Sequence, residues 1–110
     1  MITPKDKALL SFLGKETANG NLKWRATAQD NQFTVSLRGK YNVMLLKQGP
    51  LVALYLFDVN DRELLQVNQL DDRAVEEIYE YVRRKALDVD GAIDEILKGE
   101  TAEGRTSAKL

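Results

Sequence analysis

An unbroken apolar run, Leu-Val-Ala-Leu-Tyr-Leu-Phe at residues 51–57, dominates the hydrophobic pattern of the chain. Since a β-strand points alternate side chains to opposite faces of its sheet, such a strand needs apolar cover on both faces. The amphipathic segment at residues 72–87 is the expected cover for one face. Three covers for the other face stay open: the N-terminal helix, a second copy of the chain, or a binding partner.

Residues 4–18 have the pattern of an amphipathic helix. Thr3 is a suitable N-cap, and Pro4 suits the first helical position because the amide that it lacks would have no partner there. Apolar residues then recur at i, i+1, i+4 and i+5 from Ala8, which places them on one stripe. Asn19-Gly20 ends the helix, since both residues tolerate a left-handed backbone.

A five-stranded antiparallel meander is predicted between residues 21 and 67, where the apolar period changes to two. In the first hairpin, a two-residue turn at Asp30-Asn31 places Ala26 opposite Val35 and puts the apolar residues on one face. The later strands are connected by turns at residues 38–40, 48–50 and 58–61.

The registers of the later hairpins are constrained to different degrees. At Gly39, two- and three-residue loops both give apolar pairing, so this register stays open. A two-residue turn between the last two strands predicts that Phe57 faces Leu64 and that Leu56 faces Leu65.

Two helices are predicted after the sheet. The first spans residues 72–87, with apolar residues at i, i+3, i+4, i+7 and i+11 from Val75. The second begins at Asp88 and ends at Gly99. Residues 100–110 show no periodicity, which is typical of a flexible tail.

Length and composition fit one domain. The chain has 110 residues, and we expect a single α+β domain over residues 1–99, with the two C-terminal helices packed on the sheet. No apolar run reaches the roughly 20 residues of a membrane helix. The absence of cysteine and of a secretory signal fits the cytoplasm.

Charge is unevenly distributed along the chain. Residues 20–68 carry six Lys or Arg against four Asp or Glu, whereas residues 69–98 carry five against nine. A mildly basic sheet is therefore followed by an acidic helical region, although the net charge of −1 exerts no global attraction on nucleic acid or membrane.

The residue types that most often carry catalysis are missing. The chain contains neither histidine nor cysteine, and no phosphate-loop pattern, so we expect neither enzymatic activity nor a cofactor. Asp88, Asp90 and Asp94 do not form a calcium loop, because Ile93 and Gly99 occupy the positions that require glycine and glutamate. No metal site is predicted.

Two further sets of residues are of types that can bind a ligand. Lys23, Arg25, Arg38 and Lys40 form a basic face on the first hairpin that could hold nucleic acid or another polyanion, but edge strands often carry such charges only to block aggregation. Trp24 and Tyr55 are expected in the core, with the Tyr55 hydroxyl at its rim.

The segment Arg-Arg-Lys-Ala-Leu-Asp-Val at residues 83–89 carries a resemblance. Residues 82–97 in sequence, and residues 22–97 in layout, resemble small uncharacterised bacterial modules in which a β-meander precedes such a segment and a final amphipathic helix. The resemblance implies a bacterial intracellular accessory domain. It implies no activity and no site.

The surplus of apolar surface predicts a non-catalytic interaction module, with a homodimer or another protein as partner. A patch of several hundred Å² is unusual on a monomer, so a partner is expected to bury it. Binding of a polyanion is the alternative, and nucleic acid is not the expected partner. The candidate interaction residues are Met44, Leu46, Val52, Leu54, Leu56 and Leu65.

Overall fold

The computed structural model describes residues 2–103, with side chains through residue 98. It confirms the α+β layout predicted from the sequence. The elements in chain order are α1 (Pro4–Ala18), β1 (Arg25–Ala26), β2 (Gln32–Leu37), β3 (Tyr41–Gln48), β4 (Leu51–Phe57), β5 (Glu63–Asn68), α2 (Ala74–Ala86) and α3 (Val89–Glu103).

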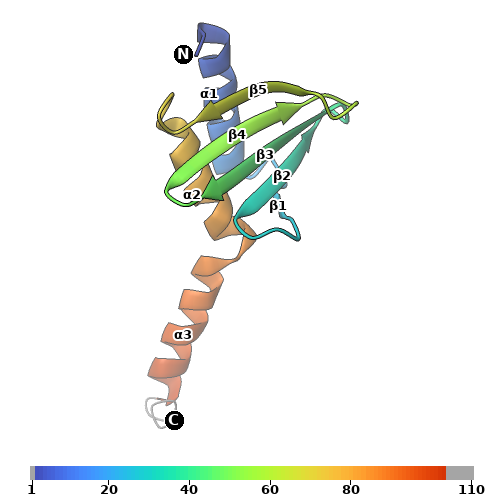
Figure 1. The fold of residues 1–110 in the computed structure, drawn as a ribbon. Helices are drawn as coiled ribbons and strands as arrows, with labels where there is room; N and C mark the ends of the chain where they lie inside the picture. Colours follow the sequence, from blue (N-terminus) through green and yellow to red (C-terminus); the bar gives the residue numbers. More distant parts are fainter. Residues whose placement is uncertain (1, 104–110) are drawn as a thin grey trace.

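The five strands form one antiparallel sheet in the order β1-β2-β3-β4-β5. Helices α1 and α2 lie on the same face of this sheet, which is turned away from the viewer in Figure 1. We call this the inner face, and the opposite one the outer face. The N-terminal helix therefore does not cover the second face of the apolar strand β4.

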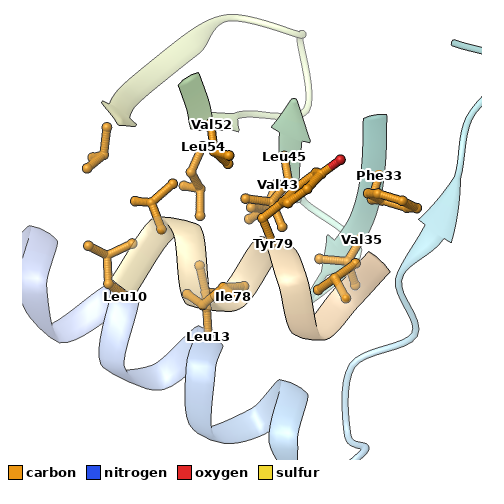
Figure 2. Packing of buried hydrophobic residues seen from close by; sticks show 13 residues of the cluster. Leu10, Leu13, Phe33, Val35, Val43, Leu45, Val52, Leu54, Ile78 and Tyr79 are labelled. Atoms are coloured by element: carbon orange, nitrogen blue, oxygen red, sulfur yellow. The ribbon is translucent and has the colours of Figure 1, made fainter. Parts of the chain in front are cut away.

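The core lies between the inner face and the two helices, as Figure 2 shows. Leu10 and Leu13 of α1 pack against α2, and α2 packs on the strands. The Tyr79 ring meets the Phe33 ring edge to face, with ring centroids 5.8 Å apart. The buried core residues are Leu10, Leu13, Phe33, Val35, Val43, Leu45, Val52, Leu54, Val67, Val75, Ile78, Tyr79 and Val82.

Helix α1 begins as predicted and is fixed at both ends. Thr3 and Asp6 form a reciprocal capping box, in which the Thr3 hydroxyl accepts from the Asp6 amide and the Asp6 carboxylate accepts from the Thr3 amide. Near the other end, the buried Thr17 hydroxyl accepts a 3.0 Å hydrogen bond from the Trp24 indole N–H. Trp24 packs on the core side, as expected.

The register predicted for the first hairpin is wrong by two residues. Ala26 pairs with Phe33 and not with Val35. A longer loop is the cause: Thr27 donates its amide to the Gln32 carbonyl, and Asn31 adopts a left-handed backbone with φ 59°. Residues 28–31 therefore form the loop.

The last hairpin departs from its predicted register at one end only. Leu56 faces Leu65 as predicted, but Phe57 pairs with Glu63 across a β-bulge that leaves Leu64 unpaired. Asp58 explains the shift, because its carboxylate accepts from two backbone amides of the turn and from the Arg62 guanidinium.

The loop left open at Gly39 has three residues. Leu37 pairs with Tyr41, and residues 38–40 form the connection. Arg38 and Gly39 both adopt positive φ, at 54° and 65°. Glycine suits this position because the left-handed region carries no steric cost for it.

Helix α3 does not pack on the sheet, contrary to the prediction for the second C-terminal helix. It projects from the sheet and from the two helices that cover it (Figure 1). The chain as a whole measures 54 Å along its longest axis and 28 and 25 Å along the others. The helix continues past Gly99 to Glu103, so the predicted end is also wrong. The rest of the predicted tail, residues 104–110, lies outside the described residues.

Among the described helices, none combines the length and hydrophobicity that crossing a membrane requires.

The contact between α1 and α2 generates a stability prediction. Leu13 is fully buried, so Leu13→Ala leaves a cavity and should lower the free energy of unfolding by about 2–5 kcal/mol. Phe12, on the same helix, is 48% exposed, and Phe12→Ala should cost less than about 1 kcal/mol. Urea unfolding followed by circular dichroism measures both. Equal losses would contradict this packing.

The turn after β4 generates a pH prediction. The pKa of Asp58 lies below its ordinary value of 3.8. The hydrogen bond from the Arg62 backbone amide contributes most to this, and the Arg62 side chain and the Asn60 backbone amide, which also donate to the carboxylate, lower the pKa further. A lowered native pKa stabilises the fold above the unfolded pKa, and this contribution is lost as the pH falls through the native pKa. Asp58→Asn should therefore be less stable than wild type at neutral pH, with a difference that shrinks in acid.

Urea midpoints measured from neutral pH to below pH 3.8 test this expectation. Asp30→Asn, in the exposed loop after β1, is the matched control and should keep the wild-type profile. A wild-type profile for Asp58→Asn would show that the turn does not depend on this carboxylate.

Candidate interaction surface on the outer face

Alternation along the strands defines the residues of the outer face. In β2–β5 the side chains that neighbour the buried ones in sequence point away from α1 and α2. The outer face of these strands comprises Gln32, Thr34, Ser36, Asn42, Met44, Leu46, Gln48, Leu51, Ala53, Tyr55, Phe57, Glu63, Leu64, Gln66 and Asn68.

Among the outer-face residues of β2–β5, only Glu63 at the β5 edge carries a charge, although 30% of the chain is Asp, Glu, Lys or Arg. Charged side chains occur only at the margins, with Arg25 opposite Thr34 on β1 and Glu63 opposite Phe57 at the bulge. A solvated sheet face normally carries polar and charged side chains. Depletion of charge is instead typical of the central part of a protein interface.

The centre of the outer face is apolar. Met44 lies opposite Tyr55, and Leu46 lies opposite Ala53 on the neighbouring strand. The Tyr55 and Phe57 rings stack with centroids 6.1 Å apart and an angle of 14° between their planes. These side chains cover one another partly, and each stays partly exposed to solvent. Methionine and aromatic residues are among those enriched at interfaces.

The structure divides the six predicted interaction residues between the two faces. Met44 and Leu46 lie on the outer face. The other four lie on the inner face, where the chain's own helices cover them: Val52 and Leu54 in the buried core, and Leu56 and Leu65 packed against it. Of the six predicted residues, only Met44 and Leu46 therefore belong to the solvent-exposed outer face.

The sequence reasoning missed Tyr55 and Phe57 as surface residues. Tyr55 was expected in the core, but it belongs to the outer face together with its neighbour in the stack. Parity along β4 is the signal that groups Tyr55 with Phe57 and Ala53. Parity alone does not say which group faces the helices, and that assignment needs the packing of α2.

The four basic candidates are not aligned across the strands in the way that the sequence predicted. The sequence predicted that Lys23 lies opposite Arg38, but the first hairpin is shifted by two residues. Strand β1 makes two pairs, Arg25 with Thr34 and Ala26 with Phe33. Arg38 and Lys40 instead lie in the loop between β2 and β3.

Lys23 and Arg25 line a pocket of about 270 Å³ beside the outer face. Its other lining residues are mainly polar and uncharged, and include Asn21, Thr34 and Asn42. This pocket therefore places two cations at the β1 margin of the apolar surface.

Two further clefts adjoin α1. One, of about 350 Å³, lies between α1 and α2 and contains a single carboxylate, Glu77. The other, of about 470 Å³, lies between α1 and the β2–β3 hairpin and contains a single cation, Arg38. Neither cleft brings together the several titratable groups that acid–base chemistry needs.

The titratable groups with shifted pKa values have structural roles. A hydrogen bond from the Ala74 amide, supported by an ion pair with Lys7, lowers the pKa of Asp72 at the start of α2. Burial in the core raises the pKa of the Tyr79 hydroxyl. Across residues 2–98, no group of three or more acidic side chains is arranged to hold a metal ion.

Comparison of the chain with models of protein families, with curated proteins and with solved structures finds no match.

Proposed function

We propose that this protein is a non-catalytic, self-associating interaction module whose docking surface is the outer face of the sheet. One observation carries the proposal: a sheet face with an apolar centre, charged only at its two edges by Arg25 and Glu63, lies open to solvent on a chain that is 30% charged. No element of residues 2–103 covers this face. Burial of Met44, Leu46, Tyr55 and Phe57 against a partner would remove their apolar surface from water.

Self-association is favoured over a foreign partner because the chain itself supplies complementary charge. The sheet region has a positive balance and the helical region that follows has a negative one. Complementary potentials accelerate encounter and select the partner. The acidic helical region of a second copy would therefore be attracted to the basic margin of the outer face.

Sedimentation velocity over a range of micromolar concentrations tests this function. Met44→Lys keeps an unbranched side chain of similar length but places a charge at the centre of the outer face. It should weaken self-association at least about tenfold, which corresponds to about 1.4 kcal/mol. Leu46→Lys should act in the same way.

Gln29→Lys is the control, because it adds the same charge in the exposed loop after β1. It should associate as wild type does. A wild-type chain that sediments as a monomer at every concentration would overturn the proposal, and so would a Met44→Lys variant that associates normally.

A second candidate function is weak binding of a polyanion at the pocket of Lys23 and Arg25. The observation in its favour is that both cations line one polar pocket of about 270 Å³. Two cations that each replace a counterion on single-stranded nucleic acid give a slope of log affinity against log salt of about −1.4.

Fluorescence anisotropy with a labelled single-stranded oligonucleotide at low salt measures this binding. Arg25→Glu should abolish it, whereas Lys5→Glu, the same charge reversal on the exposed part of α1, should leave it intact. Equal effects of the two variants, or no binding by wild type, would eliminate this candidate.

A further inference from the structure

Helix α3 carries a second apolar surface that its own chain does not bury. Val89, Ala92, Ile93 and Ile96 recur at i, i+3, i+4 and i+7 and form one stripe. Ile93 is 42% exposed and Ile96 is 66% exposed. The helix projects away from the sheet (Figure 1), so this stripe faces solvent in the monomer. Helices in proteins gain most of their stability from packing of such a stripe, which α3 lacks.

The outer face of the same molecule is out of reach for α3. Helix α2 lies on the inner face, and only Leu87 and Asp88 separate its end from the start of α3. An ion pair between Arg84 and Asp90 spans this connection and fixes the first turn of α3 beside α2. Helix α3 therefore starts on the inner side of the sheet and points away from it (Figure 1).

We propose that α3 of one copy lies across the outer face of a second copy. This inference rests on the proposed function, since it names the segment that occupies the docking surface. Ile93 and Ile96 would pack on the apolar centre around Met44, Leu46 and Tyr55. Helix on sheet is a common way to bury an apolar sheet face.

Charges of opposite sign lie beside the α3 stripe and at the β1 margin of the outer face. By their positions around the helix, Asp90 and Glu95 flank the stripe on its two sides, and Asp94 lies on the far side of the helix. Lys23 and Arg25 lie at the β1 margin of the outer face. Among the described strand residues of the outer face, the acidic one is Glu63, which lies opposite Phe57 at the β5 edge. The cations at the β1 margin are complementary in charge to α3, and the apolar centre of the face is complementary to its apolar stripe.

Two copies can make the contact twice, because each provides one α3 and one outer face. A stable interface buries about 1,600 Å² in total, and a single short helix supplies only part of this area. A closed pair with two equivalent contacts approaches that area with surfaces the chain already has.

Disulfide trapping tests the contact directly, because the wild-type chain contains no cysteine. Full-length Ile96→Cys is mixed with full-length Leu46→Cys under mild oxidation, and the products are separated by mass. The mixed heterodimer should form at least about tenfold faster than in a mixture of Gln29→Cys with Leu46→Cys, because the contact raises the effective concentration of the two thiols. No faster formation than in this control would overturn the inference.

The double variant Ile93→Lys/Ile96→Lys provides a second measurement on a projecting part of the chain, where a folding defect is not expected. It should sediment as a monomer at concentrations where wild type associates. If it associates as wild type does, while Met44→Lys is monomeric, the outer face remains the docking surface but α3 is not its occupant. If wild type itself is monomeric, the proposed function fails together with this inference.

Discussion

The packing of α2 on one face of the sheet determines most of what is distinctive about this molecule. Strand β4 has apolar side chains on both faces, and a strand of this kind is normally covered twice. Val52 and Leu54 meet α2 and become fully buried, whereas Tyr55 and Phe57 on the opposite face meet only one another and the neighbouring strands. One-sided cover thus divides a single apolar run into a core and a surface.

Helix α1 does not correct this imbalance because it is committed to α2. Its buried residues, Leu10, Leu13 and Thr17, lie on the side that meets α2 and the core. The hydrogen bond from Trp24 to Thr17 then holds the start of the sheet beside the end of α1. The chain between α1 and β1 is thus held on the inner side of the sheet. Helix α1 therefore lies in the same layer as α2.

The sequence was sufficient for the order of the elements and for the antiparallel meander, since these depend on local periodicity, but of the predicted strand pairs only Leu56 with Leu65 is confirmed. Thr3 and Pro4 predicted the start of α1, and the alternating pattern predicted five strands. The errors in register arise where single side chains reshape turns: Asn31 adopts a left-handed backbone and lengthens the first loop, and Asp58 organises the last turn so that a bulge follows. Such effects depend on hydrogen bonds that periodicity does not report.

The proposed docking surface was only partly predictable for a related reason. Parity groups Met44 with Leu46 on β3, and Ala53 with Tyr55 and Phe57 on β4, but a strand that is apolar on both parities does not indicate which group faces the core. The choice is made by the side on which α2 packs, which is a tertiary property. Four of the six predicted interaction residues fell on the inner side for this reason.

The position of α3 could not be predicted from its pattern, because an amphipathic helix packs equally well on its own chain or on another. Its docking on a second copy would also couple association to helix formation. An isolated helix of this length is marginal in water, so part of the binding free energy would be used to order α3. Association would then be weaker than the buried area alone indicates, and it would respond to concentration by mass action. Under this proposal, a free α3 and a free outer face would be two parts of one equilibrium, in which the monomer exposes the surfaces that the pair buries.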